Sequence, residues 1–293
     1  MTIASLCSLS TAAPLVRKNA GHSRIIDDLR QTAVVIVIAF VVASIIGVVT
    51  ASPTVAAADS GCPTDSDPIN TDRPNTTNSA LTVPYGSLQV ENGVTWTARD
   101  HSNVIDGSET IVRLGVARCT EFVLNVPTYF YSTDSRLSSG FSDVGVEVKR
   151  EFPLPHDFTL AATAGLFFPT GAKKVSGPGY DPFLQFPWSK GIGDGWSVSG
   201  MFTVIWFPSL SQRNPTFEPT IAIGRELGPR ADALIEYVGD YDHQRPSQIL
   251  DTGAVYRVTD HQQIDFQAGF GLNSSSLDHF FGLGYSFRFD RLF

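Results

Sequence analysis

Histidine and serine are the residue types in this chain that could build a hydrolytic site. An imidazole can activate a hydroxyl when His and Ser lie two apart on one face of a strand. His101 is followed directly by Ser102 inside a predicted loop, so the pair is adjacent rather than two apart. The other five histidines lie in the N-terminal leader, at turns or at strand ends: His22, His156, His243, His261 and His279. We therefore predict no catalytic residue.

The sequence signals for metal binding and for phosphate binding are equally weak. His243 stands near Asp240 and Asp242, but three loosely spaced polar residues in an exposed loop are usually only solvated. The glycine-rich run SGPGYD at 176–181 is not followed by the strand-to-helix context that a phosphate loop needs. The sequence predicts neither a metal site nor a bound cofactor.

Charge and composition exclude one class of partner. The 293 residues carry a formal net charge of -8 and no run of Lys and Arg, which argues against nucleic-acid binding. With 42% hydrophobic and 17% charged residues, the chain is low in charge for a soluble protein, and its class stays open on these totals.

The N-terminus has the layout of an export signal. An apolar run at 31–52 follows Arg17, Lys18, Arg24 and Arg30 and precedes the small residues Val55 to Ala58. This arrangement predicts a secretory signal over residues 1–58, cleaved near Ala58. A retained inner-membrane anchor is the alternative, because about 20 apolar residues can span a bilayer. The long basic lead leaves the true translation start open.

The residues after the leader divide into two parts. Residues 59–85 are rich in Pro, Thr, Asn, Asp and Ser without periodicity, which predicts an extended or disordered extension in the periplasm. From Gly86 onward apolar and polar residues alternate, as in Leu88, Val90, Val94 and Trp96 against the intervening polar positions. About twelve such segments of roughly ten residues recur, which is the length of a tilted strand crossing a membrane.

The predicted connections alternate between long and short. Long gaps lie at 100–108, 132–141, 170–180, 208–215, 242–247 and 273–278. Short ones lie at 119–120, 153–157, 191–195, 226–230 and 259–261. Long outer loops and short periplasmic turns are typical of outer-membrane barrels, and they place both termini in the periplasm.

Closure of the sheet explains the apolar C-terminal strand. In hydrocarbon an unpaired backbone group costs several kcal/mol, so a spanning sheet must close into a ring. His279, Phe281, Leu283, Tyr285 and Phe289 would then face lipid on a last strand that pairs with the first. We predict an all-β, membrane-spanning, antiparallel up-and-down β-barrel of about 12 strands over residues 86–293. A secreted β-sandwich or a lipocalin-like barrel is the soluble alternative.

Several motifs resemble one bacterial family. They are TDRP at 71–74, TVPYGSLQVENG at 82–93, GFSDVGVEVKREF at 140–152, GLFFPTGAKK at 165–174 and FGLGYSFRF at 281–289. Together they resemble the outer-membrane transporter family labelled for the meta-pathway of phenol degradation, over nearly the whole mature chain. The resemblance implies a barrel in the outer membrane of a Gram-negative bacterium and no enzymatic activity. The terminal aromatic of the last strand resembles the signal read by the barrel-assembly machinery, served by either Phe289 or Phe293.

Permeation is the chemistry that remains. The polar face of the predicted strands supplies the lumen-lining candidates: Glu91, Arg113, Asn125, Tyr129, Glu147, Lys149, Glu236, Asp251, Arg257, Asp265 and Arg288. Rings of such charges in a narrow lumen decide which solutes pass. We predict a channel for passive or facilitated uptake of small solutes, aromatic ones among them. A structural or adhesive barrel plugged by these charges, or a lipid-active barrel enzyme, are the alternatives.

Two cysteines remain after the leader. Cys62 precedes the first strand, and Cys119 lies in the first short turn. Asp59 stands where a lipidation motif needs an aliphatic residue, so Cys62 is not expected to carry lipid. Both cysteines would lie in the oxidising periplasm, where they either pair in a disulfide or stay free thiols.

Overall fold

The computed structural model describes residues 61–99, 102–133, 139–208, 213–242 and 246–293, and the predicted leader 1–58 lies outside them. Within these ranges no helix is long and apolar enough to cross a membrane. The regular elements are β1 Leu88–Arg99, β2 Ser102–Ala117, β3 Thr120–Asn125, β4 Tyr129–Ser132, β5 Gly140–Phe141, β6 Val144–Leu154, β7 Phe158–Phe168, β8 Asp181–Gly193, β9 Trp196–Pro208, β10 Arg213–Gly228, β11 Ala231–Asp240, β12 Ser247–Thr259, β13 Gln262–Gly271 and β14 His279–Phe289.

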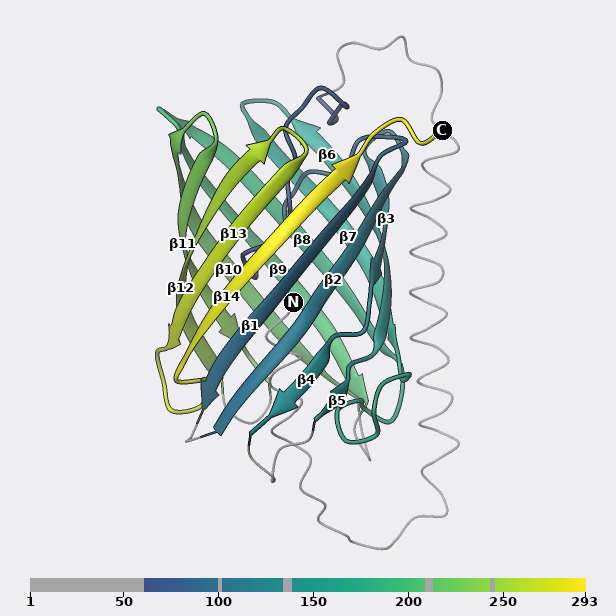
Figure 1. Cartoon of the computed structure of the whole chain (residues 1–293), viewed down its shortest axis with the longest axis vertical. Helices are drawn as coiled ribbons and strands as arrows, with labels where there is room; N and C mark the ends of the chain where they lie inside the picture. The colour runs from purple at the N-terminus through teal and green to yellow at the C-terminus, as the bar shows by residue number, and fades with distance from the viewer. Residues whose placement is uncertain (1–60, 100–101, 134–138, 209–212, 243–245) are drawn as a thin grey trace, which may run out of the picture.

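The strands form one closed antiparallel ring. β1 pairs with β14 along its length, from Leu88↔Phe289 to Ala98↔His279, and with β2 on its other side. β3 with β4, and β5 with β6, each continue as one interrupted strand, so the fourteen segments make twelve barrel strands. Figure 1 shows the tilted ring, with β14 lying beside β1. The predicted fold class is confirmed, because no strand edge is left exposed to hydrocarbon.

Polarity is inverted relative to a soluble protein. Val94, Ile264 and Leu283 on the outer face are 53%, 47% and 65% exposed, whereas inward Glu91 and Arg113 are completely buried. The exposed apolar side chains form the surface that meets lipid, and the polar ones fill the lumen. On β1 and β14 the alternation is the one expected from the sequence.

Tyr129 is a correction to the sequence analysis. It was predicted to face the lumen, but it is 42% exposed and its ring packs at 5.0 Å against outward Phe141, while Phe130 is buried inside. The strand is interrupted between Asn125 and Tyr129, at a stretch that contains Pro127, which has no backbone N–H. Inward positions are odd-numbered before this break and even-numbered after it, so alternation counted across it assigns the wrong face.

The two ends of the barrel differ as the alternating gaps predict, with short turns at one end and longer connections at the other. The short-turn end is the upper end in Figure 1, where the last residues of the chain also lie. The predicted long loop at 100–108 is mostly strand, because β2 begins at Ser102, and β10 already begins at Arg213 within the predicted loop 208–215. The strand hairpins therefore continue further toward the long-connection end than hydropathy indicates.

Candidate functional site

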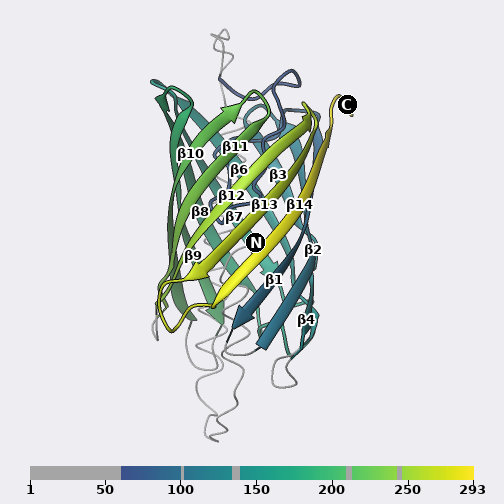
Figure 2. The same ribbon diagram turned by 60° about the vertical axis from the view of Figure 1, so that its left-hand side comes forward.

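The lumen holds an inserted piece of the chain, residues 69–87, which we call the lumenal segment. It enters at the short-turn end, where the Ile69 amide donates to the Asp260 carbonyl at 2.7 Å. It returns to that end at Gly86, whose amide donates to the Gly115 carbonyl at 2.9 Å. Figures 1 and 2 show this stretch entering the ring from the short-turn end before β1 begins. The sequence predicts an extended or disordered stretch here; in the structure the segment contains bends and a turn and packs inside the barrel, with Ile69 and Val83 each 2% exposed.

A disulfide fixes the approach to the lumenal segment. Cys62 is joined to Cys119 in the first short turn, with Cα atoms 5.3 Å apart. Nearby, Arg291 donates to Asp65 at 2.6 Å, and Arg288 donates to the Asp67 carbonyl at 2.8 Å. The chain before residue 69 is therefore tied to the rim at the short-turn end.

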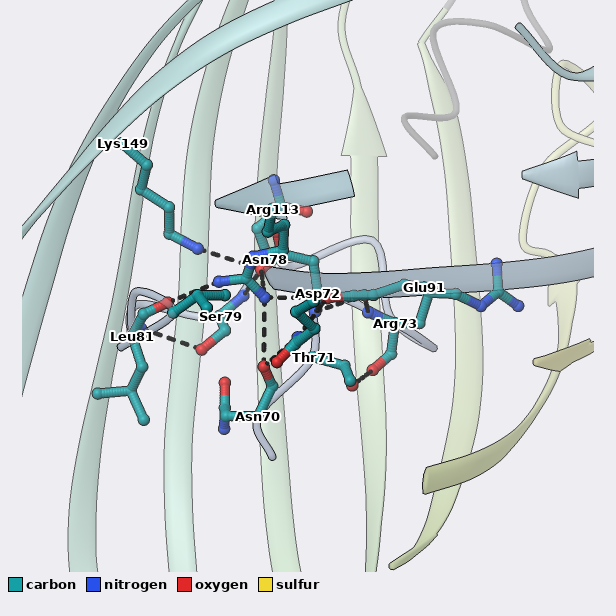
Figure 3. A network of polar contacts seen from close by, with 12 residues as sticks. Asn70, Thr71, Asp72, Arg73, Asn78, Ser79, Leu81, Glu91, Arg113 and Lys149 are labelled. Atoms are coloured by element: carbon teal, nitrogen blue, oxygen red, sulfur yellow. Dashed lines mark hydrogen bonds and ion pairs between the residues drawn. The ribbon is translucent and has the colours of Figure 1, made fainter. Parts of the chain in front are cut away.

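Arg113 is the centre of the polar network in Figure 3. Its guanidinium is fully buried and reaches Glu91 at 3.0 Å and Glu121 at 2.9 Å on the wall. It also lies 3.5 Å from Asp72 of the lumenal segment, and Lys149 reaches Asp72 at 3.1 Å. Removing one partner from such a buried network typically costs about 3–5 kcal/mol, because an uncompensated charge remains.

Arg73 contacts strands of the wall other than β6, which carries Lys149. It is ion-paired with Glu109 on β2 and lies 3.4 Å from Asp265 on β13. Gly93 makes room for it, since a Cβ at that position would overlap the guanidinium. Glycine is needed here for close approach of the segment, not for a turn.

Wall carboxylates hold the remainder of the lumenal segment by its backbone. Glu236 accepts from the amides of Thr76 and Thr77, each at 2.8 Å. On the return, the Thr82 amide donates to Glu151 at 2.8 Å and the Val83 amide to Glu121 at 2.6 Å. Hydrogen bonds from backbone amides to carboxylates satisfy buried groups on both sides.

Asp72 shows how the network sets ionisation. Burial by itself would raise the pKa of this carboxyl. The charges of Arg113 and Lys149 outweigh burial, and together with the hydrogen bond from the Ser79 amide they lower the pKa below its ordinary value of 3.8. Asp72 is therefore held as an anion inside the lumen.

The sequence-predicted candidates are placed as follows. Buried and inward are Glu91, Arg113, Glu147, Lys149, Glu236, Asp251, Asp265 and Arg288. Asn125 is half-buried and donates to Glu147, and Arg257 is half-buried near the short-turn end, paired with Asp232 at 2.7 Å. The structure brings Glu91, Arg113 and Lys149 together, whereas Arg257 and Arg288 lie near the rim. Only Tyr129 faces outward.

Sequence reasoning missed the contribution of the lumenal segment itself. Asp72 and Arg73 were read as part of an unstructured extension, although their TDRP motif carried the family resemblance. The adjacent acid and base, followed by Pro74, are the local signal that could have marked them. Glu109 and Glu121 were also absent from the candidates, although both belong to the buried network.

Two cavities flank the lumenal segment. The larger, about 80 Å³, has apolar walls at Phe167, Phe183 and Ile205 and polar ones at Glu147 and Gln185. The rings of Phe167 and Phe183 stack with centroids 5.2 Å apart.

The smaller cavity, about 40 Å³, lies between Arg73, Asp106 and Phe280. Glu109 borders both cavities. In the described part of the chain no group of three His, Cys, Asp or Glu side chains is placed to hold a metal ion.

A family model described as "Putative MetA-pathway of phenol degradation" matches residues 71–289. The chain belongs to this family. The match begins at the TDRP motif, so it includes the lumenal segment as well as the barrel. A search of curated proteins finds no match.

Solved structures with the same architecture come from outer membranes. The chain is similar to an outer membrane channel from Pseudomonas putida F1, at 17% identity and a TM-score of 0.54, over 71% of this chain and 97% of that one. It is also similar to the NanC porin, at 12% identity and a TM-score of 0.50, over 68% and 98% of the two chains. At these identities the likeness shows the fold. The protein is an outer-membrane β-barrel.

Proposed function

We propose that the protein is an outer-membrane channel for passive or facilitated uptake of small solutes, aromatic ones among them. The observation that carries this proposal is a closed ring whose interior is polar and holds a cavity with aromatic walls. Membership of a family described by phenol degradation supports an aromatic solute. The similar fold from Pseudomonas putida F1 is described as a channel.

The larger cavity supports the aromatic part of the proposal. Phe183 is 3% exposed and packs with Ile205, and Phe167 lies against them. An aromatic solute could stack on these rings, while Glu147 and Gln185 offer acceptors for a hydroxyl. Apolar walls with a few convergent polar groups are typical of small-molecule sites.

Planar-bilayer recording tests the proposal. Purified protein should produce single-channel currents, and phenol added to one chamber should interrupt them as it occupies the cavity. Phe183→Ala should weaken this interruption by at least about fivefold in concentration, the loss of about 1 kcal/mol of stacking. Phe186→Ala is the matched control, because Phe186 lies on the same strand with its side chain 40% exposed on the lipid face.

A plugged structural barrel is the second candidate. The lumenal segment is the observation that favours it, because its ion pairs and hydrogen bonds occupy the periplasmic half of the lumen. A folded protein that gives no current in bilayers and no swelling of solute-loaded liposomes would support this alternative and overturn the channel.

Export and assembly complete the proposal. We propose that the signal is cleaved near Ala58 and that the barrel-assembly machinery reads the last strand, whose Phe289 is 56% exposed. We also propose that the protein has no enzymatic activity. N-terminal sequencing of protein from outer membranes should begin near Asp59, and lipid-hydrolysis assays should stay at background.

A further inference from the structure

Carboxylates greatly outnumber cations inside the barrel. Among the described residues, thirteen Asp and Glu side chains are buried but only four Lys and Arg side chains: Arg73, Arg113, Lys149 and Arg288. All four cations already have acidic partners, at Glu109, Glu91, Asp72 and Asp290 respectively. Among the described residues, the buried carboxylates therefore exceed the buried Lys and Arg side chains by nine.

Five of these carboxylates lie toward the long-connection end, which we call the outer half. Its buried carboxylates are Asp106, Asp181, Glu218, Asp240 and Asp251. Asp106 shares the smaller cavity with buried Arg73, and no other buried Lys or Arg accompanies these five among the side chains that the structure describes. Arg99, half-buried at the outer rim, donates to the Ser275 carbonyl at 3.1 Å.

Two of these carboxylates, Asp240 and Asp251, indicate that a solute or ion compensates them, because no described protein group does. Asp240 and Asp251 are each 3% exposed, and neither oxygen of either side chain has a hydrogen-bond partner among the described residues. A buried ionised carboxylate without a partner is costly, so such groups are normally compensated by a cation or a donor. Asp251 also lies opposite Glu236 in the register of β11 and β12, which adds like charge.

Acidic residues also outnumber basic ones around the two cavities. The larger cavity is bordered by Asp72, Glu109, Asp143 and Glu147 and by no Lys or Arg. In the smaller cavity Asp106 and Glu109 face the single cation Arg73. A solute moving from the outer half past the lumenal segment therefore meets acidic groups at each stage.

We infer that the lumen selects by charge: it admits cationic and uncharged hydrogen-bond donors and excludes anions, with Asp240 and Asp251 among the selecting groups. This inference rests on the proposed channel function and names its solute class. Rings of Asp and Glu favour cations because field lines are focused in a narrow, low-dielectric passage. Aromatic solutes would then pass as phenols or protonated amines, whereas aromatic carboxylates would be held back.

Reversal potentials in a tenfold KCl gradient test this selectivity. Wild-type protein should be more permeable to K⁺ than to Cl⁻, and the ratio should fall by at least about twofold in Asp240→Asn/Asp251→Asn. Asp157→Asn/Asp194→Asn is the matched control, since it removes two carboxylates from exposed short turns and should leave the ratio unchanged. Selectivity should also weaken at 1 M salt, where the screening length falls from about 10 Å to about 3 Å. Folded barrels migrate differently on detergent gels before and after boiling, and this difference verifies that each variant is folded. If the double variant does not fold, Asp240→Asn alone is measured in its place.

Liposome swelling with lysine, glutamine and glutamate gives an independent readout on hydrophilic solutes of similar size. Lysine and glutamine should permeate wild-type liposomes faster than glutamate, and the double variant should narrow that gap. A conducting protein with a K⁺ to Cl⁻ ratio at or below one, or a lumenal variant that behaves like its control, overturns the charge selection alone. A folded protein without any current overturns the channel and this inference together.

Discussion

The two halves of the lumen use the same residue types in opposite ways. In the half toward the short turns, Glu91, Glu121 and Asp72 surround Arg113 within 3.5 Å and hold the lumenal segment in place. In the outer half, Asp240 and Asp251 have no such partners. Carboxylates that are paired with cations in one half therefore fix structure, whereas the unpaired carboxylates Asp240 and Asp251 in the other are available to solutes.

Removing residues 70–82 is the strongest way to break this comparison. Because the lumenal segment lies inside the ring, we expect single-channel conductance to rise severalfold when it is removed, toward that of an unobstructed twelve-stranded lumen. The barrel should remain folded, since Arg113 keeps Glu91 at 3.0 Å and Glu121 at 2.9 Å on the wall. Planar-bilayer recording measures the change. Unaltered conductance would show that the segment does not limit the pathway.

Among single substitutions, Arg113→Ala should destabilise the protein most, because Arg113 is the centre of the network in the half toward the short turns. It leaves three buried carboxylates without their shared cation, which we expect to cost about 3–5 kcal/mol. Arg257→Ala is the comparison, because its pair with Asp232 is partly exposed and should contribute less than about 1 kcal/mol. Urea unfolding followed by the gel shift measures both. Equal losses would mean that burial of the network does not matter.

Asp72→Asn tests, through the pH dependence of stability, whether a charged group of the lumenal segment holds it in place. The lowered pKa of Asp72 means that its charge stabilises the fold above its ordinary value of 3.8, and that this stabilisation is lost as the pH falls through the lowered value. We expect the free energy of unfolding of the wild-type protein to exceed that of the variant by about 1–3 kcal/mol at pH 7. The difference should shrink below about pH 3. A gap independent of pH in urea titrations would contradict the ionised state of Asp72.

Breaking the disulfide should have the smallest effect on the lumen. Mass mapping without reductant should recover Cys62 and Cys119 in one linked peptide pair. In Cys62→Ser/Cys119→Ser, hydrogen bonds from Glu236 and Glu151 still hold the segment, so conductance should rise far less than in the deletion. Reductant should change the conductance of the wild-type protein but not that of the double variant. Free thiols at both positions in exported protein would disprove the pairing.

Much of the architecture could be predicted from local pattern alone. Alternation with a period of two assigned Glu91, Lys149 and Leu283 to their correct faces, because each strand is continuous there. The same rule failed at Tyr129, where the interruption near Pro127 reverses the faces. One residue of irregularity is enough to do this, and hydropathy does not reveal it.

What the sequence by itself determined is the inverted polarity of the strands and the need for a closed ring, since hydrocarbon leaves unpaired backbone no alternative. What only the tertiary structure decided is the route of residues 69–87 and the partner of each buried charge. Arg73 and Asp265, separated by 192 residues, lie 3.4 Å apart only because the ring brings β13 around to β1. Alternation tells which side a residue faces; the enclosed space decides what it meets there.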